Sequence, residues 1–438
     1  MAKGLDLFFG NTPTTKKKEI IELPIIKTVP NKPKELNIET FPDVLPMAPP
    51  TVIEQQQSSD TMDKKTLKKL FQDNIKFVSS MGVQTYTLYR KWQELNGIEW
   101  SISDKQKILD IKNNIWIPKK PNDYIDLEPE VLVVNATNKE LSTTWTILRR
   151  MISTAIWSQS PGRFGKFLVR DKKTQMYLGV ISIGSDFISI GGRDKYIGWS
   201  MKNKMDDHKL NYLCMASSIV PTQPFGYNYT GGKLIAMLST SNVIEDFWNN
   251  KYAEKLAGVT TTSLYTSVKE GGKSQYTGLK MYKSCEPSDG KIPVEPEESV
   301  YVEIKKYIKE NMPVKYAELM APRKGGPASH VRPRLLSMAH KELNVKTVNN
   351  DFSRGVYFCE LYKNTNEFLC NKTEDLGERK FDNSVDALSA YWKKKYAGKR
   401  IEKLVKEGKN NNNILFYDGL IGMTFDEVKY KYLSEVGR

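Results

Sequence analysis

Apolar residues recur at helical spacing near the start of the folded part of the chain. Leu67, Leu70, Phe71 and Ile75 follow one another at intervals of one to four residues, and Tyr89, Trp92 and Leu95 repeat every third residue. Such spacing places apolar side chains on one face of an α-helix. Prolines and Asn122-Asp123 then interrupt the pattern. We therefore expect a helical segment over residues 61–125.

The pattern changes to runs of strand type between residues 127 and 300. A helical pattern through Trp145 to Ile156 is followed by an apolar run at 167–170, a polar turn at 171–175 and a second apolar run at 176–183. Two such runs around a short polar turn predict a β-hairpin. Residues 187–190 and 210–220 predict further strands, the first bounded by Gly191-Gly192. The expected fold class is α+β, with a mixed, mostly antiparallel sheet flanked by helices.

A glycine-containing loop follows the run at 210–220 and leads into another helical pattern. The loop ends in Thr230-Gly231-Gly232-Lys233. A helix start of this kind offers free backbone N–H groups to an anion, and a lysine adds a charge for phosphate. The spacing excludes a Walker A loop and a dinucleotide fingerprint. The remaining interpretations are a pyrophosphate cradle for acyl-coenzyme A and a structural cap without a ligand.

The order of helix, antiparallel hairpin, strand, glycine loop and helix resembles the GNAT acyltransferase fold. In that family the hairpin corresponds to 167–183 and the cradle to 229–233, although the usual Gln or Arg and the Gly-x-Gly pattern are missing here. The resemblance implies acetyl-CoA or another acyl-CoA as cofactor, held by Thr230, Gly231, Gly232 and Lys233. Asp186, Asp194 and Tyr265 are candidates for proton transfer. Each carboxylate is also a possible turn former or ion-pair partner, and Tyr265 a possible core residue.

Longer phrases indicate a narrower relationship. Residues 178–186, 251–265, 354–358 and 361–369 resemble a family of phage and bacterial proteins that includes the DruA component of Druantia anti-phage defence. The resemblance covers about residues 127–400. As a fold idea only, the chain also resembles phage Mom-type proteins that modify DNA. The family implies a defence or phage context, and the fold idea implies DNA modification.

The charge balance favours a polyanionic partner, and DNA is the first to consider. The chain has 66 Lys and Arg against 51 Asp and Glu, a formal net charge of +15. Residues 320–410 hold 19 basic against 11 acidic residues, which favours a phosphate-binding surface over a solvated helix face. The candidate nucleic-acid contacts are Arg323, Lys324, Arg332, Arg334, Lys393, Lys394, Lys395, Lys399 and Arg400.

Residues 1–60 have a different composition from the rest. They hold eight of the 21 prolines and nearly balanced charges, which predicts a disordered Pro-rich tail. Leu5, Leu7, Phe8 and Phe9 form an apolar island within it. This string resembles peptides that dock on replication sliding clamps, although the usual opening glutamine is missing. The alternative is an N-terminal segment that packs on its own domain.

Cysteine and histidine usage argues against a metal or disulfide framework. Four cysteines and three histidines lie far apart, without zinc-ligand spacing, so we expect no metal and a reducing compartment. Cys214, in an apolar run, should be buried and inert. No apolar run is long enough to span a membrane, and no secretory signal opens the chain. We expect a cytoplasmic protein.

These observations predict four parts: the tail at 1–60, the helical segment at 61–125, a GNAT-like domain at 127–300 and a basic helical or mixed region at 301–438. The leading hypothesis is a DNA-associated acyltransferase, or DNA-modification protein, acting on DNA or a DNA-associated amine. The alternative is a nonenzymatic DNA-binding protein with a degenerate GNAT-like domain. A third hypothesis is an interaction protein recruited through the N-terminal apolar island.

Overall fold

The structure is a computed structural model that describes residues 62–156, 162–226, 230–264, 274–288, 291–321, 331–351, 353–409, 411 and 413–432. The chain divides into two units, Met1–Asp60 and Thr61–Arg438. Every element described below belongs to the second unit. The expected tail, including Leu5, Leu7, Phe8 and Phe9, lies outside the described residues.

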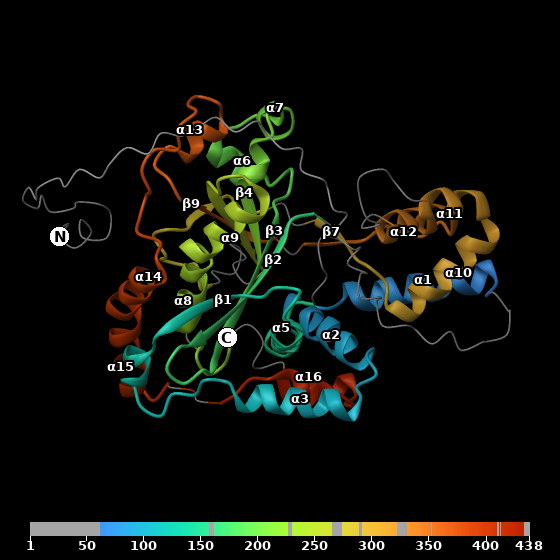
Figure 1. Cartoon of the computed structure of the whole chain (residues 1–438). Helices are drawn as coiled ribbons and strands as arrows, with labels where there is room; N and C mark the ends of the chain where they lie inside the picture. Colours follow the sequence, from blue (N-terminus) through green and yellow to red (C-terminus); the bar gives the residue numbers. More distant parts are fainter. Residues whose placement is uncertain are drawn as a thin grey trace, which may run out of the picture. The chain divides into compact units, whose positions relative to one another are not determined.

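One sheet of seven strands organises the described part of the second unit (Figure 1). Its strand order is β1-β2-β3-β4-β5-β9-β6, and every neighbouring pair is antiparallel except β4 and β5. The strands are β1 (Pro129–Val133), β2 (Phe164–Asp171), β3 (Tyr177–Ser185), β4 (Leu213–Pro221), β5 (Gly258–Ser263), β9 (Gly355–Glu360) and β6 (Lys283–Cys285). This confirms the α+β class, the mostly antiparallel sheet and the hairpin of β2 and β3.

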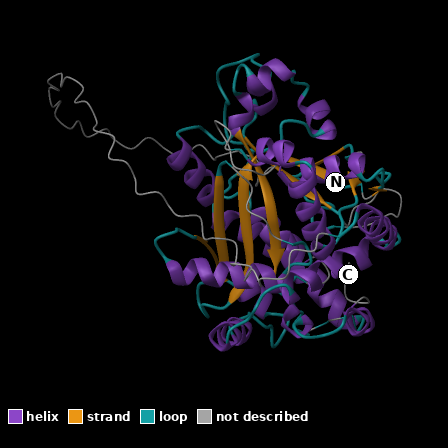
Figure 2. Ribbon diagram, turned by 90° about the vertical axis from the view of Figure 1, so that its right-hand side faces the viewer, coloured by secondary structure: helices purple, strands orange, loops and turns teal. Residues whose placement is uncertain are grey.

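Helices cover both faces of the sheet (Figure 2). Trp145 of α5 (Lys139–Ile152) donates its indole N–H to backbone oxygens of β2 and β3 and packs in one core with Val180. Gly179 faces Ile235 of α8 (Thr230–Leu238). Because neighbouring strand residues point to opposite faces, α5 and α8 cover opposite faces of the sheet. Phe247 of α9 (Asn242–Tyr252) packs on Phe167.

The two parallel strands separate soon after they meet. β4 and β5 pair only from Leu213 to Met215 of β4, although β4 continues to Pro221. Two side chains that follow β5 fill the opening. Gln275 donates its amide to the Ile219 carbonyl of β4 at 2.9 Å, and the Tyr276 hydroxyl lies 3.3 Å from that of Thr261 on β5. These contacts satisfy backbone and hydroxyl groups that strand pairing leaves open.

A second apolar core lies in a group of helices that we call the helical arm. It consists of α1 (Lys64–Ser79), α10 (Glu298–Asn311), α11 (Pro313–Met320) and α12 (Val331–Glu342). Leu67, Phe71 and Ile75 of α1 are buried there, together with Ile304 and Leu335. The helical spacing predicted for α1 is therefore confirmed. The short strands β7 (Lys291–Pro293) and β8 (Asn349–Asp351) pair with each other. In the sequence, β7 precedes α10 and β8 follows α12.

The other N-terminal helices pack with α5 and with the C-terminal residues. α2 (Val83–Asn96) and α3 (Ile102–Asn113) share a core with α5 and with residues 415–432. In particular, Trp92 of α2 donates its indole N–H to the Met423 carbonyl, and its ring packs on Phe425 at the start of α16 (Phe425–Tyr432). Segments far apart in the sequence thus share cores. The domain boundaries at 125 and 300 stay predictions.

Six further described helices are short. They are α4 (Asp123–Asp126), α6 (Gly191–Ile197), α7 (Met201–Met205), η1 (Lys209–Tyr212), α13 (Thr365–Leu369) and η5 (Tyr417–Leu420). The strand predicted at 187–190 is wrong, because these residues form a loop before α6. The loop's backbone bonds to side chains instead of a strand: Phe187 donates its N–H to Asp186, and its carbonyl accepts from Arg193. Phe187 and Ile188 are exposed there.

The basic C-terminal stretch forms a helix with one wide turn. α14 (Val385–Trp392), the π-helix η4 (Lys393–Ala397) and α15 (Gly398–Lys406) follow one another directly. The Gly398 N–H bonds to the Lys393 carbonyl, five residues earlier. The extra residue of this π turn shifts the buried face from Trp392 to Ala397, a step of five, and then to Ile401 and Leu404. Lys394 and Lys395 consequently point to solvent.

Candidate functional site

The glycine loop predicted to hold an anion leads into a helix whose first turn is closely packed. Thr230 is buried, and its carbonyl accepts the indole N–H of Trp392 at 2.7 Å. A Cβ placed on Gly231 would lie 2.4 Å from the Phe225 carbonyl oxygen, and one on Gly232 would lie 2.8 Å from the Gln275 side chain. Gly231 therefore requires glycine for close packing against the backbone of the preceding loop, whereas a larger residue at Gly232 would displace the end of the Gln275 side chain.

Lys233, the charged member of that set, is partly buried and already bonded. Its ammonium donates to the carbonyls of Gln275, at 3.3 Å, and Thr277. It also lies 5.2 Å from the centre of the Tyr396 ring. Burial and the positive charge of Arg400 lower the pKa of Lys233 to about 8. Its charge consequently changes close to physiological pH.

The fold brings two predicted sets of residues together. The candidate cofactor residues Thr230 and Lys233 lie in the first turn of α8, and α14 and the lysine-rich η4 that follows it pack against this helix. Figure 1 shows α8 beside α14. Trp392 and Tyr396 make the contacts, because Trp392 bonds to Thr230 and the Tyr396 hydroxyl donates to the Gly278 carbonyl at 3.0 Å. More than 150 residues of sequence separate the two sets. We call the combined surface of Lys233, Lys393, Lys394, Lys395, Lys399 and Arg400 the η4 surface.

Most cations of the η4 surface are open to solvent. Lys394, Lys395, Lys399 and Arg400 are exposed, and Lys393 is partly exposed. None of these five has an ion-pair partner among the residues that the structure describes. Unpaired cations on one rigid helix suit several phosphate groups at once, since their charges are not neutralised within the protein.

The other predicted nucleic-acid residues do not belong to the η4 surface. Arg332 and Arg334 belong to α12 in the helical arm. Arg332 pairs with Glu295 and Glu298 at 2.9 and 2.6 Å and lies over the Tyr301 ring, whereas Arg334 is exposed and has no ion pair within the described residues. Arg323 and Lys324 lie outside the described residues.

The candidate catalytic carboxylate Asp186 belongs to a buried charge network. Arg193 Nη1 lies 2.7 Å from Asp186 Oδ2, in an orientation that makes an ion pair without a directed hydrogen bond, and neither side chain is exposed. Thr260 Oγ1 of β5 and the Phe187 N–H also donate to this carboxylate. Burial raises the pKa of Asp186, against the opposing effect of Arg193. The contacts join the end of β3 to β5 and α6.

Asp194, the second candidate, continues the same network. Arg193, Lys204 and Trp199 donate to its two oxygens at 2.6–2.9 Å. Burial raises the pKa of Asp194, but Arg193 and these hydrogen bonds outweigh it, so the pKa lies below its usual value. A carboxylate that accepts this many bonds is a poor proton acceptor. Tyr265, the third candidate, lies outside the described residues.

Two structural features had no counterpart in the sequence reading. One is the opening between β4 and β5 that Gln275 and Tyr276 fill. The other is a buried cation group in which Lys91 bonds to Glu94 and to the Arg150 carbonyl, while burial lowers the pKa of Lys91 to about 8. Both depend on contacts between distant segments.

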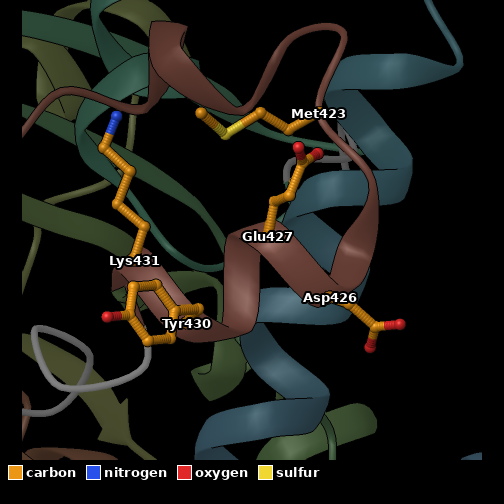
Figure 3. A pocket seen from close by; sticks show the side chains of 5 residues that line it. All are labelled: Met423, Asp426, Glu427, Tyr430 and Lys431. Carbon is orange, nitrogen blue, oxygen red and sulfur yellow. The ribbon is translucent and has the colours of Figure 1, made fainter.

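Other candidate sites are weaker. A shallow hollow beside α16 is lined by Met423, Asp426, Glu427, Tyr430 and Lys431 (Figure 3). Its acids already have partners, since Glu427 accepts from Thr424 and Asp426 pairs with Lys429. Within the described residues, no group of three metal-ligating side chains could hold a metal ion.

Cysteine burial and helix hydropathy give two further findings. The four cysteines are free, and Cys214 is buried, which confirms that part of the prediction. Burial raises the pKa of Cys214 well above its usual value, so the prediction that this thiol is inert stays a prediction with a physical reason. In the described part of the chain, no helix combines the length and the apolar character needed to cross a bilayer.

The protein is thus of the α+β class. It carries a helix whose exposed cations have no ion pair with the described residues, and this helix packs beside the first turn of α8. The sequence matches the family described as Druantia protein DruA over residues 86–371, well over half of the chain. The chain therefore belongs to the DruA family, which confirms the resemblance found in the sequence phrases. Comparisons with curated proteins and with solved structures gave no match.

Proposed function

We propose that this DruA-family protein binds DNA in an anti-phage defence context, and that the η4 surface contacts the phosphate backbone. The single observation that carries the proposal is the group of unpaired, solvent-facing cations at Lys394, Lys395, Lys399 and Arg400 on one helix. Trp392 and Tyr396 anchor this helix to α8 and to the loop that contains Gly278. Rigid anchoring reduces the entropy lost on binding.

Contacts of this kind read phosphates and supply little sequence preference. Five of the six cations on the η4 surface are lysines, whose ammonium groups act as point charges. The affinity for DNA should therefore depend steeply on salt and little on sequence, because neutralised phosphates release counterions.

The test is the triple variant Lys394→Gln/Lys395→Gln/Lys399→Gln, measured by fluorescence anisotropy with a short labelled DNA duplex. At 0.1 M salt each lost phosphate contact should weaken affinity roughly eightfold and lower the salt slope by about 0.9. Glutamine keeps the helix propensity of lysine. Folding is checked by circular dichroism.

The matched control removes the same charge elsewhere. Lys105 and Lys107 of α3 and Lys172 of the β2–β3 turn are exposed and have no ion pair within the described residues. The control variant Lys105→Gln/Lys107→Gln/Lys172→Gln should bind nearly as the original protein does. Equal losses in the two variants would mean that net charge alone is responsible, and the proposed interface would be abandoned.

A second candidate function is acyl transfer to DNA or to a DNA-associated amine, with acetyl-CoA or another acyl-CoA as donor. A specific observation favours it: β4 and β5 run parallel and part after Met215, and β4 leads through the glycine-containing loop into α8. This order resembles a GNAT-like core. Opposing it, Gln275 fills the opening, and Lys233 is bonded to carbonyls.

Calorimetry with acetyl-CoA tests this candidate. Binding that is lost in Lys233→Ala supports an acyl-CoA site at the start of α8, whereas the absence of heat at millimolar ligand rejects it. Nucleoside mass spectrometry from cells that express the protein then reports any modified base. Docking on a sliding clamp through Leu5, Leu7, Phe8 and Phe9 is a separate proposal, tested by clamp co-elution after deletion of residues 1–12.

A further inference from the structure

The first described helix carries a line of cations on the face opposite its core. With 100° of rotation per residue, Lys65, Lys69 and Lys76 lie within about 40° of one another, and Gln72 lies beside them. Leu67, Phe71 and Ile75 face the arm's core instead. Lys65, Lys69, Gln72 and Lys76 are exposed. Lys65 and Lys76 are separated by about 17 Å along the helix axis, at 1.5 Å per residue.

The neighbouring helix α12 carries two further exposed cations. Lys64 at the start of α1 pairs with Glu342 at the end of α12, and the Phe71 and His340 rings pack at 4.8 Å. The exposed Lys341 consequently lies near the first turn of α1. Arg334 lies seven residues before Lys341, which places both on one face of α12.

The acids of the arm are largely engaged elsewhere. Glu342 pairs with Lys64, Glu295 and Glu298 pair with Arg332, and Glu303 pairs with Lys306. Asp73 is the one acid on α1, against five lysines. Lys65, Lys69 and Lys76 have no ion pair among the residues that the structure describes. Helix α1 therefore carries five lysines against one acid, and the three cations of the line form no ion pair with the described residues.

We propose that α1, with Lys341 and Arg334 of α12, is a second surface for the phosphate backbone of duplex DNA. Its length matches about five base pairs, at 3.4 Å per phosphate along one strand. Helix α1 lies outside residues 86–371, the part that matches the DruA family. Lys65, Lys69 and Lys76 thus add to the proposed function, on which this inference rests, a contact outside the matched region, whereas Arg334 and Lys341 lie within it. The contribution of this surface is independent of the η4 surface.

The test uses the full chain and three variants in parallel. The α1 variant is Lys65→Gln/Lys69→Gln/Lys76→Gln, compared with the η4 variant and with the control at Lys105, Lys107 and Lys172. Affinity for a labelled DNA duplex is measured by anisotropy over a range of salt concentrations. We expect the α1 variant to lose at least tenfold in affinity at 0.1 M salt and to lower the salt slope by two to three.

The outcomes separate the two surfaces. A loss in the α1 variant that matches only the control overturns the second surface, whatever the η4 variant does. Losses in both the α1 and η4 variants support two contact surfaces. A loss in the α1 variant alone supports this inference while removing the η4 surface as the interface. Because glutamine substitutions on exposed helix positions leave the core intact, an unchanged urea midpoint shows that the variant is folded.

Discussion

Two regions of this protein hold charged residues of the same kinds in opposite arrangements. Around Asp186 and Arg193 the charges are buried, and each has a partner. On the η4 surface, Lys394, Lys395 and Lys399 are exposed, and no ion pair with the described residues neutralises them. In the first region, ion pairs and hydrogen bonds among these charged groups join β3, β5 and α6. In the second, the charges remain available to a ligand.

The difference shows which observation separates structural charges from binding charges. A buried charge must be compensated, because its desolvation costs several kcal/mol. An exposed lysine has no such requirement, and a row of them repels itself unless an anion binds. Partner count and burial therefore distinguish the two roles, whereas residue type does not. Substitutions in each region test this distinction.

The largest effect is expected at the buried network. Asp186→Asn removes one of the two carboxylates that compensate the buried Arg193 and leaves Asp194 as its remaining partner. It should lower the free energy of unfolding by about 3 kcal/mol. Urea unfolding followed by circular dichroism measures this change. DNA affinity of the folded fraction should stay unchanged, since Asp186 has no exposed atoms in its side chain.

Asp73→Asn is the matched control for that experiment. Asp73 is an exposed carboxylate on α1, and its change should alter the free energy of unfolding by no more than about 0.5 kcal/mol. If the two variants unfold at the same urea concentration, Asp186 does not hold the network together. A loss of DNA binding by folded Asp186→Asn would instead return it to the list of functional residues.

The second-largest effect is expected at Gly231, in the first turn of α8. Gly231→Ala should destabilise the protein by about 1–3 kcal/mol, because the new Cβ would lie 2.4 Å from the Phe225 carbonyl oxygen. Gly191→Ala, at the first turn of α6, meets no atom within 4 Å and should be nearly neutral. Thermal unfolding of both variants checks the difference. Similar melting temperatures would favour a ligand role for Gly231 over a packing role.

The sequence was informative wherever local pattern determines structure. The helical spacing of Leu67, Phe71 and Ile75 and the polar turn at 171–175 identified α1 and the β2–β3 hairpin, since each depends on neighbours only a few residues away. At residues 187–190 the same reasoning gave a wrong prediction. The apolar residues there suggested a strand, yet Asp186 and Arg193 bind the backbone of Phe187 and hold it in a loop.

The candidate sites were less predictable because they depend on distant contacts. Gly231 and Lys233 were interpreted as an anion cradle, because no local pattern indicates that Phe225, Gln275 and Trp392 pack there. Likewise, Arg332 and Arg334 looked equivalent in sequence, and only the structure pairs one of them with Glu295 and Glu298. The cofactor and DNA assignments themselves stay predictions.

A smaller effect should appear within one helix. Arg332→Gln breaks partly exposed ion pairs and should cost about 1 kcal/mol of stability or less, with no change in DNA affinity. Arg334→Gln should leave stability unchanged and weaken DNA binding up to about eightfold at 0.1 M salt. Urea unfolding and anisotropy, applied to both variants, test this reversal. The contrast fails if Arg332→Gln weakens binding more than Arg334→Gln does.

The smallest effect is a pH dependence of DNA affinity that Lys233 causes. This residue is partly buried and bonded to carbonyls, and it also belongs to the η4 surface. Its pKa is lowered to about 8 by burial and by Arg400, so its charge is present below pH 8 and lost above it. DNA affinity should therefore fall by a few-fold between pH 7 and 9, since at most one phosphate contact is lost. From this group alone, stability should rise with pH between about 8 and 10.5, where the unfolded chain binds the proton more tightly. Lys233→Arg keeps the charge over this range and should remove the pH dependence of binding; if the dependence persists in that variant, another group causes it.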